Sequence, residues 1–254
     1  MSETSLSGGG QLPRRAFLQY AGAGASLAAL ALAGCSDEEE QPIVPAVTTV
    51  DVGGTDVGAL NFVYALKQVE LAFYTALRTG TYYTGLAPDS AEKQILDDLQ
   101  KHESVHGTFF RSLLTVGSAI RLLETDFSNV DLNTRLSAPG AAHPGVLNVA
   151  MALEDLGVAA CNGSARFITN AQTLLTLGKI VSVEAHHAAM VRDLVSYNSF
   201  VDNDVVEVFT PGTSGTPGDG TGTGLERAKS FTDILAVINP YLKEGSKLTA
   251  TQLV

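Results

Sequence analysis

Two short stretches of the chain repeat the same pair of chemically active residues. QKHESVHGTF holds Glu103 and His106, and SVEAHHAAMV holds Glu184 and His187. With 13 glutamates and 5 histidines in 254 residues, chance gives only about 0.26 such Glu-x-x-His pairs. On a helix, residues three apart lie about 60° from each other and reach the same inner point. Carboxylate and imidazole groups suit iron or manganese, so the two pairs predict two halves of one metal site.

Two solitary glutamates interrupt apolar stretches elsewhere in the chain. Glu70 is the only acidic residue between Val57 and Pro88, and Glu154 lies on an apolar stripe with Asp155 beside it. A lone ionised carboxylate in a core costs several kcal/mol unless it is paired or binds a metal. We therefore expect the four glutamates to compensate one another around a shared site. The alternative is a bundle whose inner polar residues only hydrogen-bond to one another, with some carboxylates protonated.

These residues need helices to position them, and apolar residues recur at three- and four-residue spacing from Gly58 onward. The predicted helices span about residues 58–80, 90–123, 145–167 and 170–197, with Ser90 as an N-cap. The short link between the last two makes them antiparallel neighbours, and the irregular stretch TDFSNVDLNTRLSAPGAAHP can travel the length of a bundle. The prediction is an all-α fold of two antiparallel hairpins joined by a long crossover. A short C-terminal helix in SFTDILAVINPYL completes it.

The order and spacing of the candidate ligands resemble the ferritin-like dimetal carboxylate proteins over about residues 58–200. The stretches LNFVYALKQVELAFYTALRTG and FTDILAVINPYL also look like bacterial ferritin-like-domain proteins related to desiccation-associated proteins. The resemblance implies a ferritin-like four-helix bundle. It also implies six metal ligands, which are Glu70, Glu103, His106, Glu154, Glu184 and His187.

Charge counting favours two metal ions over one. Four carboxylates carry −4, and two divalent ions cancel that charge. By the resemblance, one carboxylate of each Glu-x-x-His helix bridges two iron or manganese ions roughly 3.5–4 Å apart, while Glu70 and Glu154 are terminal. Tyr74 lies one turn beyond Glu70 and could donate a hydrogen bond to a ligand or carry electrons; ordinary core packing is the plainer alternative. For His102 and His186 we expect a solvated or supporting role rather than ligation.

Composition excludes several classes of function. The net charge is −11, so binding to nucleic acid phosphates is not expected. Only two cysteines are present, too few for a cysteine-rich zinc site, a disulfide framework or the rubredoxin part of a rubrerythrin. Hydrophobic residues make up 45% of the chain, which is enough for a buried core without such cross-links.

The N-terminus reads as an export signal. Arg14 and Arg15 precede Phe17 and an apolar run that is too short to span a bilayer comfortably, which resembles a twin-arginine signal. Pro13 before the arginines departs from the usual pattern, so ordinary secretion stays open. LAGC, ending at Cys35, resembles a bacterial lipobox and implies a lipidated cysteine. An ordinary signal peptide with a chance cysteine is the alternative.

The predicted organisation has five parts. They are a signal peptide (1–34), a solvated tether (35–56), the ferritin-like bundle (57–200), a flexible Gly/Thr/Pro-rich linker (201–226) and a C-terminal helical segment with its tail (227–254).

The expected function is that of an exported protein, lipid-anchored in the periplasm or at the cell surface. It would bind two iron or manganese ions and oxidise Fe(II) with dioxygen or peroxide, or remove peroxide. Fold does not set chemistry, so whether it is an enzyme stays open. The rival expectation is a non-catalytic stress, desiccation-related or scaffold protein with a structural or vestigial metal site. The oligomeric state is also open, with a homodimer as one candidate.

Overall fold

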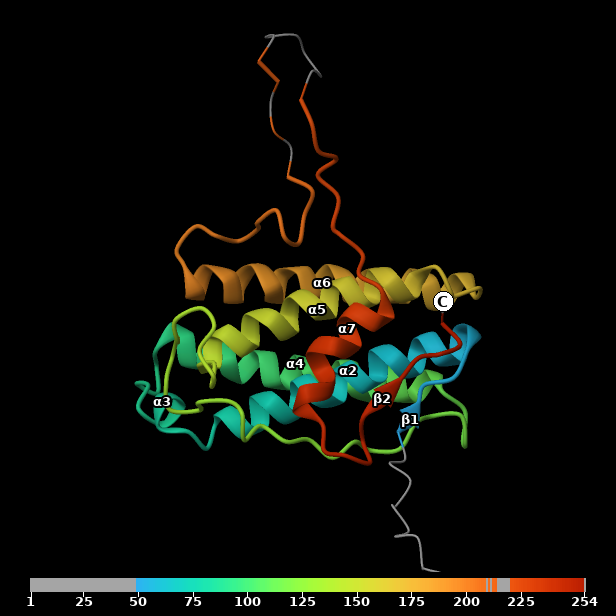
Figure 1. The fold of residues 1–254 in the computed structure, drawn as a ribbon, viewed down its shortest axis with the longest axis horizontal. Helices are drawn as coiled ribbons and strands as arrows, with labels where there is room; N and C mark the ends of the chain where they lie inside the picture. Colours follow the sequence, from blue (N-terminus) through green and yellow to red (C-terminus); the bar gives the residue numbers. More distant parts are fainter. Residues whose placement is uncertain (1–48, 209, 211, 214–219, 254) are drawn as a thin grey trace, which may run out of the picture. The chain divides into compact units, whose positions relative to one another are not determined.

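Four long helices form the bundle of this computed structural model, which describes residues 49–208, 210, 212–213 and 220–253. They are α2 (Thr55–Leu77), α4 (Ala91–Leu113), α5 (Val146–Ala165) and α6 (Ala171–Val195). Figure 1 shows them side by side, with α2 and α4 forming one pair and α5 and α6 the other. The all-α prediction is confirmed.

Side-chain caps fix where the two Glu-x-x-His helices begin. The Ser90 hydroxyl accepts from the Lys93 N–H at the start of α4, and Asn170 Oδ1 accepts from the Thr173 N–H at the start of α6. Each bond satisfies a donor that the first helical turn leaves free. Both helices therefore start near the residues that the sequence indicated.

Each hairpin is antiparallel, and a long connection joins the two. Within the first hairpin, Arg78 at the end of α2 meets Asp97 near the start of α4, and Lys67 in mid-helix meets Glu103. The link between α2 and α4 contains the short helix α3 (Thr81–Thr84). Residues 114–145 form the irregular crossover to α5. This is the connectivity expected of a ferritin-like bundle.

The crossover starts earlier than the apolar pattern indicated, since α4 ends at Leu113 and not near Leu123. Side chains of α2 bind the backbone that follows. Asn61 Oδ1 accepts from the Ile120 N–H, and Gln68 Oε1 accepts from the Leu123 N–H. These tertiary hydrogen bonds replace the helical ones that the local pattern predicted.

Two apolar clusters lie on either side of the candidate ligands along the helices. On α4, Glu103 and His106 lie between Leu99 of one cluster and Phe110 of the other. On α6, the second pair lies between Ile180 and Val191 in the same way. The candidate ligands thus form a polar layer between two apolar layers.

The C-terminal segment packs against the bundle through α7 (Phe231–Ile238) and a 3₁₀ turn, η1 (Asn239–Tyr241). The Phe231 ring lies 4.4 Å from that of Phe62 on α2 and 5.4 Å from that of Phe167 after α5. The predicted C-terminal helix is therefore part of the core.

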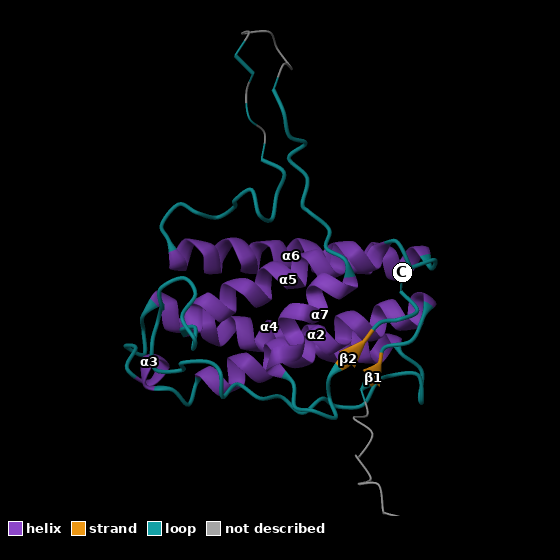
Figure 2. Cartoon of the chain, in the orientation of Figure 1, coloured by secondary structure: helices purple, strands orange, loops and turns teal. Residues whose placement is uncertain are grey.

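A short parallel strand pair corrects the expected tether. β1 (Val50–Asp51) pairs with β2 (Leu248–Thr249) in Figure 2, and Val50 and Val52 are buried. The folded part thus begins before residue 57, because the C-terminal segment supplies a partner for the residues just before α2. In the expected linker, Val206 bridges Glu226 and Val205 is buried, so its two ends pair with each other.

The predicted signal peptide, Cys35 and most of the tether lie outside the described residues. Among the residues that are described, no helix combines the length and apolar character needed to cross a bilayer.

Candidate metal centre

All four helices send glutamates into one buried cluster. Glu70, Glu103, Glu154 and Glu184 have no exposed surface, and His106 and His187 are also buried. Each comes from the middle part of its helix, where the polar layer lies. The structure therefore brings together all six side chains that the sequence put forward as ligands.

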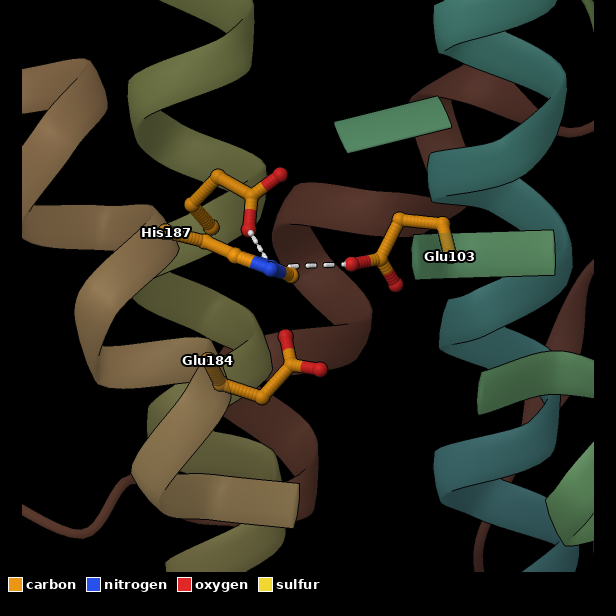
Figure 3. Close-up of side chains that lie close together, drawn as sticks. Glu103, Glu184 and His187 are labelled. Atoms are coloured by element: carbon orange, nitrogen blue, oxygen red, sulfur yellow. Dashed lines mark ion pairs between the residues drawn. The ribbon is translucent and has the colours of Figure 1, made fainter. Parts of the chain in front are cut away.

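Through its Nδ1 atom, each histidine faces a glutamate of the opposite hairpin, and His187 also faces Glu154 of its own hairpin. His187 Nδ1 lies 3.1 Å from Glu103 Oε1 and 3.4 Å from Glu154 Oε2. Figure 3 shows the His187 ring pointing toward Glu103, with Glu184 nearby on the His187 helix. His106 Nδ1 lies 2.7 Å from Glu184 Oε1. The two pairs thus interlock across the bundle.

The cluster also contains a lysine that the sequence interpretation missed. Lys67 on α2 is fully buried, and its Nζ lies 2.5 Å from Glu70 Oε2, 2.5 Å from Glu184 Oε2 and 2.8 Å from Glu103 Oε2. A signal was present, because Lys67 stands three residues before Glu70 and is the only basic residue of α2. The count of −4 made from the sequence therefore omitted the positive charge of Lys67.

A glycine on α5 makes room for these head groups. A Cβ atom on Gly157 would lie 2.6 Å from Glu184 Oε2, 3.1 Å from Glu70 Oε1 and 3.3 Å from Lys67 Nζ. Gly157 also stands three residues after Glu154, on the same face of the helix. A side chain at this position would thus displace the Glu184 carboxylate from where it now lies.

Two residues outside the six hold members of the cluster in place. The Tyr74 hydroxyl donates to Glu154 Oε1 at 2.5 Å, so the supporting role considered for Tyr74 fits its position. His102, which is exposed, places its Nδ1 2.8 Å from His187 Nε2. His186 is exposed. His102 thus fixes the ring whose other nitrogen faces the glutamates.

Burial and the neighbouring charges move the pKa values of these groups in opposite directions. Burial lowers the pKa of Lys67, but the attraction of Glu103, Glu184 and Glu70 outweighs it and holds that pKa well above its ordinary value. Burial raises the pKa of Glu70 well above its ordinary value. Burial acts the same way on Glu103, yet Lys67 and the two histidines hold its pKa well below the usual range. Lys67 thus pairs with ionised Glu103, while Glu70 favours its proton.

His187 titrates far from its ordinary range. Burial lowers its pKa, but hydrogen bonding to Glu103 and Glu154 raises the pKa to about 10. Burial raises the pKa of Glu154, and the His187 contact works against that rise. Without a metal, His187 therefore holds a proton between the two carboxylates at neutral pH.

The donor set fits a metal ion. Six carboxylate oxygens at the centre, and Nδ1 of both histidines, make no hydrogen bond of good geometry. All of them except Glu70 Oε1 lie within ion-pair distance of Lys67 or of a partner across a histidine–glutamate pair. Buried polar atoms are normally hydrogen-bonded, so these oxygens retain the capacity to bind a cation. One ligand atom from each of four residues lies within 4.8 Å of the other three; these residues are Glu103, Glu154, Glu184 and His187. Three carboxylates and one imidazole suit iron or manganese.

Comparison with known families agrees with this geometry. A family model described as a ferritin-like domain matches residues 55–197, which cover the four helices and all six candidate ligands. The chain belongs to the ferritin-like family. No curated protein matches this ferritin-like chain. Membership confirms the fold and supports metal binding at the centre, while the number and identity of the ions stay predictions.

Next to the centre of this ferritin-like domain, a buried ion pair ties α5 to α6. Arg192 Nε and Nη2 donate to the two oxygens of Asp155 at 2.9 and 2.7 Å, and Nη2 also donates to Asp204. Asp155 follows Glu154 directly, and Arg192 lies five residues after His187. The two-bond pairing fixes the angle and register of the helices that carry these ligands.

Proposed function

We propose that this ferritin-like protein binds iron or manganese in the cell envelope and oxidises Fe(II) with dioxygen or peroxide, or removes peroxide. One observation carries the proposal. Four buried glutamates and two buried histidines converge on one place from four helices, and four of these residues can offer ligand atoms within 4.8 Å of one another. Such a group is costly without a cation, so its presence in an apolar core favours metal binding.

The residues around the centre have separate tasks in this proposal. A bound iron or manganese ion would supply redox chemistry that the side chains lack. The glutamates and His187 would hold it, Tyr74 would orient Glu154, and His102 would orient His187. The apolar clusters exclude water from both ends of the polar layer. A cleft whose lining includes Lys67, Ser104 and Gly107 lies between α2 and α4.

Elemental analysis of protein purified from its own host tests the metal. The wild type should contain iron or manganese, and Glu103→Ala should lose it, because Glu103 contacts both His187 and Lys67. Asp98→Ala, which removes an exposed carboxylate from the same helix, should leave the metal content unchanged. A wild-type protein without metal would contradict the proposal.

The envelope location rests on the sequence of the N-terminal region. If Cys35 carries a lipid, Cys35→Ser should move the protein from the membrane fraction to the soluble fraction. Serine keeps the size of the side chain and removes the thiol that lipidation requires. Unchanged membrane association would count against the anchor. Sedimentation of the same preparations would report whether the protein is the homodimer considered above.

A non-catalytic scaffold or stress protein is the second candidate, and Lys67 favours it. The lysine already compensates part of the carboxylate charge, so the centre has internal support before any ion binds. The two candidates differ in turnover. Oxidation of added Fe(II), or consumption of hydrogen peroxide, by metal-loaded protein supports the enzyme. Bound metal without either reaction supports the scaffold.

A further inference from the structure

We propose that the ammonium group of Lys67 stands where one of two metal ions would bind, so that the centre holds a single ion. This inference rests on the proposed function, because it specifies how many ions the same cluster takes and where. The remaining site lies on the side of the cluster away from Glu70. Its ligand atoms come from Glu103, Glu154, Glu184 and His187.

The position of Lys67 Nζ is the first argument. It lies 2.5–2.8 Å from one oxygen each of Glu70, Glu103 and Glu184, which is the range of charged hydrogen bonds. A metal ion needs the same oxygens at about 2.0–2.2 Å. An ion bound by these three oxygens would meet the positive charge of Lys67 at close range. Ammonium and ion therefore compete for the Glu70 side of the cluster.

The two faces of the central carboxylates are the second argument. Glu103 turns Oε2 to Lys67 and Oε1 to His187, at 2.8 and 3.1 Å. Glu184 likewise turns Oε2 to Lys67 and Oε1 to His106, at 2.5 and 2.7 Å. The ferritin-like resemblance implied that one carboxylate of each pair helix bridges two ions. Here each of these two carboxylates lies between Lys67 and a histidine, with one oxygen facing each.

The two terminal glutamates have different surroundings, which is the third argument. Glu70 lies next to Lys67 and has no atom in the group of four ligands. Glu154 belongs to that group, where Tyr74 holds one oxygen and His187 faces the other. The cluster is therefore asymmetric, with a lysine at one end and a metal-ligand set at the other.

Charge alone does not favour a second ion once Lys67 is counted. If a bound ion leaves all four carboxylates ionised, the carboxylates and one ammonium together carry −3. One divalent ion leaves −1, whereas two leave +1, so the totals are equally far from neutral. One trivalent ion leaves the centre neutral. Charge therefore does not set the number of ions. The position of Lys67, in the space that Gly157 leaves open, favours a single ion.

Metal stoichiometry tests the inference directly. Full-length protein is loaded with Mn²⁺ or, without oxygen, with Fe²⁺, then desalted, and its ions per chain are measured by elemental analysis. The wild type should bind one ion. Lys67→Met, which keeps the length of the side chain and removes its charge, should bind two. Two ions in the wild type, or a single ion in folded Lys67→Met, would overturn the inference.

A matched pair of glutamate variants tests the asymmetry. Glu154→Gln should reduce the affinity for the single ion by about 10–100-fold or more, whereas Glu70→Gln should still bind one ion. In a two-ion centre, each variant would lose one ion. Circular dichroism checks that both variants keep their helices. Equal losses in the two variants would contradict a single ion beside Glu154.

Anomalous diffraction from Mn²⁺-loaded wild-type crystals needs no variant. One peak beside Glu154 and His187 is expected, and a peak beside Glu70 would overturn the inference. A wild type without any ion, together with an empty Lys67→Met, would instead remove the proposed metal function itself. An empty wild type whose Lys67→Met variant binds metal would show that Lys67 excludes all ions, which also overturns a single-ion centre.

Discussion

Gly157 of α5 and Glu184 of α6 approach so closely that a side chain at position 157 would displace the Glu184 carboxylate. A Cβ atom on Gly157 would lie 2.6 Å from Glu184 Oε2, nearer than real Cβ atoms come to other heavy atoms. Glycine in a helix interior costs about 1 kcal/mol relative to alanine. Glycine at this position thus lowers the stability of α5 but leaves room for the Glu184 carboxylate at the centre.

Gly157→Ala should therefore weaken metal binding by at least about 10-fold, because Glu184 and Lys67 must move apart to admit a methyl group. Gly178→Ala on α6 is the matched control, since nothing lies within 4 Å of its added Cβ. The control should gain up to about 1 kcal/mol in free energy of unfolding and keep its metal affinity. Titration with Mn²⁺ and urea unfolding measure the two effects. Full metal affinity in Gly157→Ala would show that the close contact is unimportant.

The helices and the six candidate ligands could be predicted because both follow the helical period. Glu103 and His106 share a face with Leu99 and Phe110, so a three- and four-residue pattern places them inside the bundle. The helix starts near Ser90 and Asn170 could also be predicted, Ser90 as an N-cap, and both side chains cap the first turn. These features depend on residues that are close in sequence.

Features that depend on distant residues could not be predicted in the same way. The pairing of Val50 with Leu248 joins opposite ends of the folded part. Asn61 on α2 binds the Ile120 N–H in the stretch after α4, where the apolar pattern had predicted more helix. Lys67 is a special case. A lysine on a helix usually points to solvent, and only the structure shows that this one is buried with most of α2.

Tyr74→Phe should destabilise the metal-free protein by about 1.5–3 kcal/mol, because Glu154 loses the hydroxyl that donates to its Oε1. Tyr64→Phe on the same helix is the control, since Tyr64 packs in the second apolar cluster and not in the polar layer. The control should change the free energy of unfolding by less than about 1 kcal/mol. Chemical unfolding after chelator treatment measures both variants. Equal effects in the two would mean that the Tyr74 hydroxyl does not support Glu154.

His102→Ala should lower metal affinity by about 10–100-fold while leaving the helices intact, because His102 holds the outer nitrogen of His187. His186→Ala removes an exposed histidine beside the ligand and should leave the affinity unchanged. Competition with a chelator of known affinity measures the difference. His102→Gln retains a hydrogen-bonding side chain and should recover part of the loss. If both alanine variants bind metal like the wild type, His102 does not position His187.

The metal-free protein should lose stability as the pH rises from about 6.5 to about 10. The pKa of His187 rises to about 10 in the folded state, against an ordinary value of about 6.5, so the folded state holds the proton more tightly. This contribution is fully present below pH 6.5 and disappears as the pH passes through the folded-state pKa. Hydrogen bonding to Glu103 and Glu184 raises the pKa of His106 against the opposing effect of burial, so His106 acts in the same direction.

Urea unfolding of chelator-treated protein at pH 6, 7.5 and 9 measures this dependence, and His187→Gln should flatten it. Metal binding should show the opposite trend, because His187 must release its proton before Nδ1 can bind an ion. Affinity for Mn²⁺ should therefore increase over the same pH range, and the stability difference between loaded and metal-free protein should widen. A metal-free protein that is more stable at pH 9 than at pH 6 would contradict the protonated His187 between Glu103 and Glu154.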